Sequence, residues 1–418
     1  VNEQTKQVNI EVPAGTDVKA LVPTIIVSDK ATVTPASGTQ VDFTNPVVYT
    51  VKAEDGSTAA YVVTVTVKGE VNPGGNTTVT DPQELNGTID KHTTLKDLGL
   101  PIDYIIDGTL WISGNATLTI EKGVTIAFAS SSSAIDVAGD CGLVMKGTKD
   151  MPIQFTGVPT NPGSGAWDRI ALHSSRKENV WEYVEFINGG SNEEMVAILE
   201  EAKVTIKNCT FKGSDSDAIW VNGAATVLAA ENNIFEDNAG YPIVVNDFRT
   251  LDTFSDNSFK NNDNEMIRIN AYWFEKGNKY TFKNPGIPYF LHNGARAIDN
   301  GTTCTIEEGV TFIVKEAESV NFEYETKLIV KGTEKAPVTF KGLADDMYWN
   351  GLFLYCSRSE SINIENLIVS EGGYEDNSQA IYIDNDAKGT MKNVKVSNSN
   401  AYGIKLGNRG NEEPHIST

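Results

Sequence analysis

The chain has 418 residues, and 56 acidic side chains against 34 Lys and Arg give it a formal charge of −22. This charge excludes nucleic acid as a partner and disfavours an anionic polysaccharide, whereas a neutral glycan, a protein surface or divalent cations remain compatible. The acidity is better accounted for by the solubility of an exported protein than by a particular partner. Gly, Asn, Asp, Ser and Thr punctuate short β-branched and aliphatic runs, which predicts an all-β fold.

Residues 1–69 predict a small immunoglobulin-like β-sandwich, because short apolar runs recur there and several alternate with polar residues. An Asp55-Gly56 pair between the last two runs predicts a hairpin turn. Residues 70–83 are rich in Pro, Gly and polar side chains and predict a linker. The predicted strands are Val8–Val12, Thr24–Val27, Ala31–Thr34, Val47–Val51 and Tyr61–Val67.

The termini give no direct evidence of targeting. The chain begins at Val1 without a methionine and contains no apolar stretch long enough for a membrane helix. A mature exported protein whose targeting signal has been removed would have these features.

Phenylalanine recurs at a nearly constant interval in the next part of the chain. Phe186, Phe211, Phe235, Phe259 and Phe282 are separated by 25, 24, 24 and 23 residues. Such a period is typical of a solenoid, in which each turn places one strand above the previous one. We therefore expect these rings to stack in one column in the core.

An asparagine row advances with the same period. Asn222, Asn246 and Asn270 are 24 residues apart, and each follows a short apolar run. Asparagines at a bend can hydrogen-bond across adjacent coils, so we expect them to stack as well. Two rows with one period predict a parallel β-helix. Roughly thirteen coils spaced about 4.8 Å apart would form a rod about 60 Å long.

A larger duplication overlies the short period. Matching segments recur in the same order at an offset of 182 to 186 residues. The duplication predicts two tandem β-helix modules, residues 84–285 and 286–418, stacked as one continuous rod. The matching segments include Thr119–Thr125 with Thr305–Thr311, Pro152–Gly157 with Pro337–Gly342, and Trp167 with Trp349.

These segments resemble a known family. The run from Asp103 through Leu118–Val124 and Trp167 to Gly190 is similar to bacterial surface proteins with the pectate-lyase-like, right-handed parallel β-helix fold. Residues Val41–Gly56 are similar to immunoglobulin-like modules near the lipid-anchored end of such proteins. The resemblance implies a cell-surface, outer-membrane lipoprotein and adhesin. Its contact with the membrane would be only through an N-terminal lipid anchor that has been removed.

Catalysis is common in right-handed β-helices, and it has recognisable sequence signatures. A galacturonase-type hydrolase carries a Gly-His-Gly motif, and none of the four histidines lies in that context. A lyase needs a basic residue facing carboxylate-bound Ca²⁺. Arg268 is a candidate base, but a strand residue facing solvent explains it better. We therefore predict a non-enzyme without a cofactor, for which structural Ca²⁺ has no support in the sequence. The alternative is a polysaccharide lyase or glycoside hydrolase whose carboxylates converge without a linear motif.

Aromatic side chains on a flat β-face are the usual platform for sugar rings, and they supply most of the candidate ligand-binding residues. Alternation turns Trp220 outward, which favours ligand binding and lateral packing equally. Capping of the seam between the modules explains the aromatic run 272–274 as well as a ligand does. A loop that folds back on the rod explains Trp349 better, and an exposed turn is the better account of Asp345-Asp346. The candidates are Trp220, Tyr272, Trp273, Phe274, Tyr348, Trp349, Asp345 and Asp346.

The sequence thus predicts an exported, non-catalytic and monomeric surface protein for cell adhesion or glycan binding. Its partner would be a polysaccharide or a protein on a host or cell surface. The four cysteines, Cys141, Cys209, Cys304 and Cys356, lie far apart without metal-ligand spacing. Cys209 is interpreted as a small buried hydrophobe, and the sequence leaves disulfides open.

Overall fold

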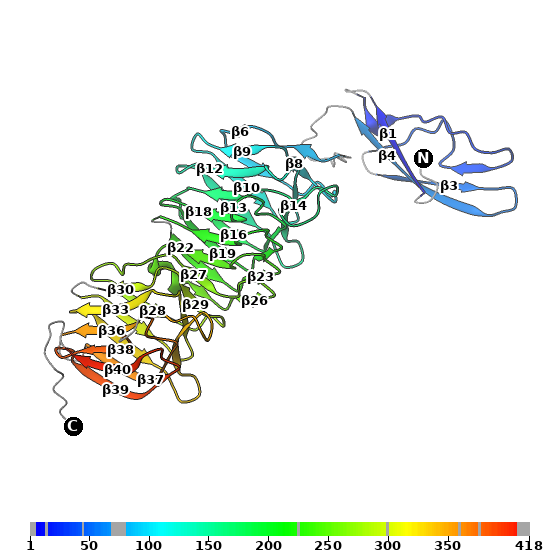
Figure 1. The fold of residues 1–418 in the computed structure, drawn as a ribbon. Helices are drawn as coiled ribbons and strands as arrows, with labels where there is room; N and C mark the ends of the chain where they lie inside the picture. Colours follow the sequence, from blue (N-terminus) through cyan, green and yellow to red (C-terminus); the bar gives the residue numbers. More distant parts are fainter. Residues whose placement is uncertain are drawn as a thin grey trace. The chain divides into compact units, whose positions relative to one another are not determined.

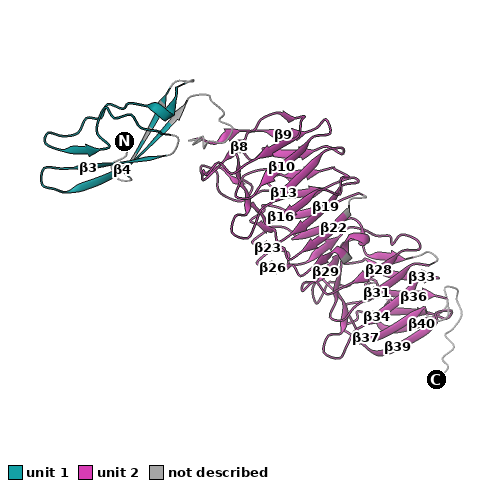
Figure 2. Ribbon diagram, turned by 180° about the vertical axis from the view of Figure 1, so that it is seen from behind, with its two compact units in different colours: residues 1–80 teal, residues 81–418 magenta. Residues whose placement is uncertain are grey.

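The computed structural model describes residues 6–12, 16–43, 46–67, 81–223, 226–297, 301–357, 361–374 and 378–407. The chain divides into two compact units, Val1–Thr80 and Asp81–Thr418 (Figures 1 and 2). Within these ranges the regular structure consists of strands and two short 3₁₀ helices, η1 (Val18–Ala20) and η2 (Phe248–Thr253). The all-β prediction is confirmed. Most of the predicted linker 70–83 lies outside the described residues.

Unit 1 holds a four-stranded sheet with the order β1-β4-β3-β2. The predicted Asp55-Gly56 turn joins β3 to β4 as an antiparallel hairpin, with Gly56 at a φ of 86°. The predicted strand Thr24–Val27 is wrong: the segment forms no ladder with any described strand. The immunoglobulin-like sandwich therefore stays a prediction. The strands are β1 (Gln7–Val12), β2 (Thr32–Thr34), β3 (Val47–Lys52) and β4 (Thr58–Val67).

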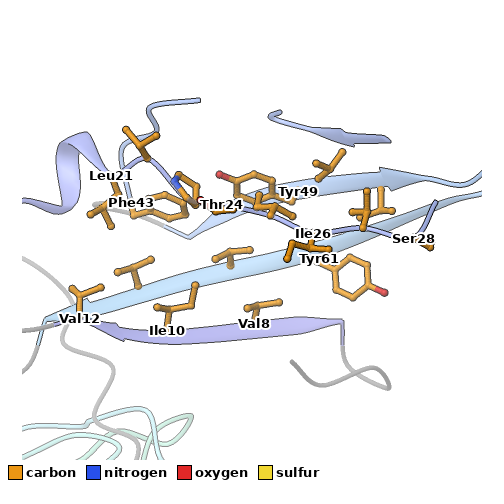
Figure 3. A pocket seen from close by; sticks show the side chains of 18 residues that line it. Val8, Ile10, Val12, Leu21, Thr24, Ile26, Ser28, Phe43, Tyr49 and Tyr61 are labelled. Atoms are coloured by element: carbon orange, nitrogen blue, oxygen red, sulfur yellow. The ribbon is translucent and has the colours of Figure 1, made fainter. Parts of the chain in front are cut away.

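A groove of about 770 Å³ lies in unit 1 between this sheet and the segment Leu21–Ser28 (Figure 3). Its lining is almost entirely aliphatic and aromatic. Tyr49 is buried there, and its hydroxyl has no hydrogen-bond partner. Ile26, which also lines the groove, is 91% exposed. The described part of unit 1 is therefore only loosely filled with apolar side chains.

Unit 2 is a right-handed parallel β-helix of about 12 turns. In its first part each turn contributes one strand to each of three sheets in succession. We call the eight-stranded one the Phe sheet. Its strands are β5 (Gln83–Glu84), β8 (Tyr104–Ile106), β11 (Thr125–Phe128), β14 (Ile153–Gly157), β17 (Val184–Ile187), β20 (Thr210–Lys212), β23 (Ile234–Glu236) and β26 (Ser258–Lys260).

The second sheet has seven strands. They are β7 (Thr93–Leu95), β10 (Thr117–Glu121), β13 (Gly142–Lys146), β16 (Val180–Glu182), β19 (Lys203–Lys207), β22 (Thr226–Glu231) and β25 (Phe254–Ser255).

The third, which we call the long sheet, runs through both parts of unit 2. Its first eight strands are β6 (Thr88–Ile89), β9 (Thr109–Ile112), β12 (Ala134–Val137), β15 (Ile170–Leu172), β18 (Val196–Ile198), β21 (Ile219–Val221), β24 (Ile243–Val245) and β27 (Ile267–Ile269). It continues through β29 (Tyr289–Leu291), β32 (Thr311–Val314), β35 (Val338–Gly342) and β37 (Ile362–Ser370). The strands β34 (Lys327–Lys331), β31 (Thr303–Ile306), β28 (Lys279–Phe282) and β39 (Gly389–Ser397) complete it.

A five-stranded sheet, here called the C-terminal sheet, forms another face of the last coils (Figure 1). Its strands are β30 (Ala295–Ala297), β33 (Ser319–Tyr324), β36 (Gly351–Cys356), β38 (Gln379–Asp384) and β40 (Tyr402–Gly407). The core of unit 2 is one cluster of buried apolar side chains enclosed by these sheets.

The predicted phenylalanine column is confirmed for four of its five members. Phe186, Phe211, Phe235 and Phe259 occupy one register row of the Phe sheet, and successive ring centroids are 4.9, 4.9 and 5.4 Å apart. Phe282 is wrong as a fifth member, because β28 belongs to the long sheet and pairs there with β31. The column instead extends backward to Phe155, whose ring stacks on that of Phe186 at 5.4 Å.

The asparagine row is confirmed as a hydrogen-bonded ladder. Asn246 donates from Nδ2 to Oδ1 of Asn222 at 2.6 Å, and Asn270 donates to Asn246 at 3.1 Å. Each asparagine side chain thus hydrogen-bonds the asparagine of the adjacent coil. These bonds fix the bend that follows the long sheet.

The two copies of the duplicated sequence do not use the same sheet. The segment Pro152–Gly157 contains β14, which lies in the Phe sheet. The matching segment of the second copy contains β35, which lies in the long sheet. The change from one arrangement to the other occurs between β27 and β28. In this segment Trp273 forms an isolated parallel β-bridge with Arg296 of β30. The second copy therefore continues the same coil, but β35 lies one sheet further round than the matching β14. β27 and β29 pair directly, so the long sheet is not interrupted.

A tryptophan closes the coil at the equivalent point of each copy. Trp167 and Trp349 are fully buried, and each donates from Nε1 to a backbone carbonyl at 2.8 Å, that of Ile187 and that of Ser370. The indole of Trp167 leaves no room beside Gly189, where a Cβ would lie 2.5 Å from the ring. The matched tryptophans therefore hold their loops on the core.

Candidate functional site

Aromatic side chains gather on the outer face of the C-terminal sheet. The strand pairing aligns Arg296, Asn321, Phe353, Tyr382 and Lys405 in one outward row. These positions face outward because their neighbours along each strand, such as Leu352 and Leu354, are fully buried. A parallel bridge with Arg296 adds Trp273 to the start of the row, and Tyr355 lies two residues beyond Phe353.

Three of these rings, those of Phe353, Tyr355 and Tyr382, contact one another. Phe353 and Tyr355 stack with centroids 6.1 Å apart, and Tyr355 lies 5.2 Å from Tyr382. Trp273 is 50% exposed, whereas Phe353 and Tyr355 are partly exposed. We call Trp273, Phe353, Tyr355 and Tyr382 the aromatic platform. From Trp273 to Tyr382 the row spans four strand spacings, or about 19 Å, which accommodates several sugar rings in line.

A charged pair lies within the platform. Arg296 donates from Nε to Oε1 of Glu323 at 2.8 Å, and Glu323 is 2% exposed. The guanidinium also lies 5.4 Å from the centre of the Trp273 ring. Burial alone would lower the pKa of Arg296, but Glu323 and Tyr272 raise it above its ordinary value. Arg296 is therefore a fixed cation that supplies hydrogen-bond donors beside the rings.

Two of the predicted ligand-binding residues thus meet at one surface, since Tyr272 packs edge to face against Trp273 at 4.8 Å. Phe274 is wrong as a ligand residue: it is buried and stacks on Phe248 at 4.0 Å in the core. Trp349 is wrong for the same reason, because its ring stacks on Phe340 at 6.2 Å inside the coil.

The remaining predicted residues lie elsewhere. Tyr348 is partly exposed and its carbonyl accepts the Ala317 amide at 3.2 Å. Asp345 and Asp346 lie on an exposed turn, where the Asp345 carbonyl accepts from Asn398 at 3.0 Å. Trp220 faces outward from the long sheet and donates to Asn246 at 3.3 Å. The structure brings none of them to the aromatic platform.

Phe353, Tyr355, Tyr382 and Arg296 were not predicted from the sequence. The segment Gly351-Leu-Phe-Leu-Tyr-Cys356 alternates, so Phe353 and Tyr355 face one side of the strand. That signal was present, but alternation does not tell which side faces the core when every residue is apolar.

Three carboxylates stand just before neighbouring strands of the long sheet, at the opposite end of the strands from the asparagine ladder. Asp168, Glu194 and Asp217 stand two residues before β15, β18 and β21, which are adjacent in the long sheet. The amide of Met195 donates to the carbonyl of Asp217 at 2.9 Å, which aligns these segments. We call these three residues the acid column. Burial raises the pKa of Glu194, with a further contribution from Asp217 and Asp168, and burial also raises the pKa of Asp217.

The described residues contain no group of three or more His, Cys, Asp and Glu side chains arranged to hold a metal ion. All four cysteines are buried as free thiols, and burial raises the pKa of Cys209 to about 12. No helix in the described part of the chain is long and apolar enough to cross a membrane.

Comparison with known proteins identifies two domains. Residues 1–65 match the family model of the SGBP (surface glycan-binding protein) N-terminal domain. Residues 87–182 match the family model of the pectate-lyase like beta helix domain. No curated protein and no solved structure matches the chain. The chain thus joins an N-terminal domain of surface glycan-binding proteins to a pectate-lyase-like β-helix, a combination that indicates a protein of the cell surface.

Proposed function

We propose that the chain is a non-catalytic surface glycan-binding protein whose ligand lies on the aromatic platform. The observation that carries this proposal is the row of rings along the outer face of the C-terminal sheet, in which Trp273, Phe353 and Tyr355 are at least partly exposed and Tyr382 is 8% exposed. Aromatic faces offer apolar area to the C–H faces of sugar rings, and polar groups at their edges fix the orientation of the ligand.

The chemistry of the platform favours a neutral glycan. Arg296 and Asn321 stand between Trp273 and Phe353 in the row, where they can hydrogen-bond sugar hydroxyls. Glu323 already neutralises Arg296, so the pair presents no free charge to recruit an acidic sugar. The overall charge of −22 also repels polyanionic chains.

The SGBP N-terminal domain supports an arrangement in which unit 1 lies near an N-terminal lipid anchor and the β-helix displays the ligand. Attachment to the outer membrane, a monomeric state and a role in cell adhesion belong to this proposal. A protein on another surface is the second class of partner that the aromatic platform suits, since aromatic side chains and Arg are enriched in such interfaces.

The proposal is tested by isothermal titration calorimetry of the whole chain against a panel of neutral and acidic oligosaccharides. Trp273→Ala and Tyr355→Ala should each weaken binding of a neutral glycan about tenfold, which corresponds to about 1.4 kcal/mol. Trp111→Ala is the matched control, because Trp111 is also 50% exposed but belongs to β9 of the long sheet. Equal losses in all three variants would contradict a role for the aromatic platform.

The acid column favours a second candidate, a polysaccharide lyase or glycoside hydrolase. Its Glu194 lies 3.6 Å from Arg169, and paired carboxylates are the groups that such enzymes use for acid–base chemistry. Incubation with the same oligosaccharides distinguishes the candidates. Release of reducing ends or unsaturated uronates that Glu194→Gln abolishes would establish the enzyme, and intact ligand would support the binding protein.

A further inference from the structure

The β-helix of unit 2 has two ends of different character. At its N-terminal end, the strands β5, β6 and β7 of the first coil are only two or three residues long. Residues 81–107 carry six acidic side chains against two lysines, and none of the large apolar side chains in this described range is exposed. Short edge strands and charged side chains prevent a sheet from pairing with a further strand. The N-terminal end of the coil is therefore protected.

The C-terminal end lacks this protection. The last coil contributes β39 and β40 (Figure 1), which together we call the open edge. β39 is nine residues long and pairs with β37, and β40 is six residues long and pairs with β38. No strand among the described residues pairs with the other side of either one. Each strand thus presents a row of backbone N–H and C=O groups that can hydrogen-bond a further strand.

β40 also leaves core positions uncovered. Ile404 is in register with Ile381 of the preceding coil and therefore occupies a core position. Ile381 is fully buried, whereas Ile404 is 49% exposed. Leu406 lies two residues further along, on the same side of the strand, and is 39% exposed. The terminal repeat of a solenoid normally has a polar outer surface, so exposed aliphatic side chains at core positions indicate that a partner covers them.

The open edge is basic, although the whole chain has a formal charge of −22. Residues 388–407 contain four lysines and no acidic side chain. Lys392 pairs with Glu365 of the preceding coil at 3.1 Å. Lys405, which stands between the two exposed aliphatic residues of β40, is itself exposed and forms no ion pair within the described residues. A partner that is complementary to this edge therefore carries acidic side chains.

A second copy of this chain does not provide that complement. Two open edges placed end to end would oppose lysine to lysine, which is destabilising. The first coil of a second copy has the opposite charge, but its described residues offer neither an exposed large apolar side chain nor a strand longer than three residues. Residues 408–418 contain one large aliphatic side chain, Ile416, which is too few to cover the core positions of β39 and β40. These observations favour a strand from another protein.

We propose that the open edge is a protein-binding site, at which an extended segment of another protein pairs with β40. In the bound segment, apolar side chains alternate with acidic ones. The backbone of the segment hydrogen-bonds the free side of β40, its apolar side chains cover Ile404 and Leu406, and its acidic side chains face Lys405. This site lies at the end of the coil, is separate from the aromatic platform and does not depend on glycan binding.

The test uses two synthetic peptides and the whole chain. In one peptide valine alternates with glutamate, and in the other valine alternates with lysine. Calorimetry should show that the glutamate peptide binds at least about tenfold more tightly than the lysine peptide. Hydrogen exchange followed by mass spectrometry should show slower exchange of the amides of Tyr402–Gly407 when the glutamate peptide is bound. Equal binding of the two peptides, or protection at another strand, would overturn the inference.

Two pairs of variants test the contacts. Ile404→Thr should weaken binding of the glutamate peptide about tenfold. Ile234→Thr is its matched control, because Ile234 is 42% exposed but belongs to β23, which is paired on both sides. Lys405→Glu should reverse the preference between the peptides, whereas Lys331→Glu, an exposed lysine of the doubly paired β34, should not. Equal effects within either pair would contradict pairing at β40.

Further measurements separate this inference from other occupants and from the proposed function. Trp273→Ala should leave peptide binding unchanged while it weakens binding of neutral glycans. Circular dichroism confirms that each variant is folded, and Lys405→Glu provides a second test if Ile404→Thr is not. Protection of every β40 amide in the free chain would show that a segment of this chain already covers the edge. Sedimentation that reveals self-association through β40 would assign the edge to a second copy, and either result would overturn the inference.

Discussion

The interior of the coils and their outer faces follow different rules, although the same strands build both. In β21, Ile219 and Val221 point inward and repeat the pattern of the coils on either side. Between them, Trp220 points outward, and its register partners are Ala197 and Val244. Inside, each residue must match the one above it because the coils stack at a fixed spacing. Outside, no such requirement exists, so the outer rows are free to carry binding chemistry.

The largest expected loss of stability is in the phenylalanine column inside the coils. Phe211→Ala removes a ring that is fully buried between Phe186 and Phe235, and it should reduce the free energy of unfolding of unit 2 by about 3–5 kcal/mol. Chemical denaturation followed by circular dichroism measures this loss. Phe211→Leu should cost clearly less, because it retains most of the buried volume. Equal costs for the two variants would contradict a ring column as the source of stability.

A substitution in the asparagine ladder tests whether these hydrogen bonds stabilise the bend that follows the long sheet. Asn246→Ala removes a donor to Asn222 and an acceptor for Asn270, and it should cost about 1–2 kcal/mol of unfolding free energy. The same denaturation experiment measures it, with Asn192→Ala as an exposed control. An unchanged unfolding midpoint for Asn246→Ala would show that the ladder is not needed at the bend.

A substitution in the acid column should increase the free energy of unfolding, whereas the two substitutions above reduce it, and the increase should depend on pH. Burial holds the pKa of Glu194 above its ordinary value, so the folded protein binds this proton more tightly than the unfolded chain. The destabilisation is absent below the ordinary Glu pKa, grows as the pH rises through the raised value, and is complete above it. Glu194→Gln should therefore stabilise the protein by about 1 kcal/mol at neutral pH and by less near pH 4. Thermal unfolding at both pH values measures the difference, and a destabilised variant at neutral pH would contradict the assignment.

The smallest expected effect on stability is at the aromatic platform. Trp273→Ala should change the unfolding free energy by no more than about 0.5 kcal/mol, since half of the side chain is already in solvent. Its binding loss would then be a loss of contact with the ligand. Thermal unfolding measured beside the calorimetry checks this, and a large destabilisation would assign Trp273 to the seam between the two copies.

The sequence predicted the interior better than the outer faces. The period of 24 residues identified the columns of Phe211 and Asn246, because stacking forces identical spacing on the chain. The period predicted the wrong position for Phe282, because β28 belongs to the long sheet although the spacing of the phenylalanines hardly changes. At the candidate site, Trp273 was predicted because the aromatic run 272–274 directly follows Asn270 of the asparagine row. Arg296 and Tyr355 were not, because they meet it only through strand pairing of segments distant in sequence. In unit 1, a short apolar run predicted a strand at Thr24–Val27, but the side-chain pattern does not supply a backbone partner.

A crystal structure of the whole chain with a bound neutral oligosaccharide, chosen from the calorimetric panel, tests the central claim most directly. The account predicts sugar rings packed against Trp273 and Tyr355, with hydroxyl groups hydrogen-bonded to Arg296. An oligosaccharide bound in the groove of unit 1, or on the long sheet with the aromatic platform empty, would contradict it.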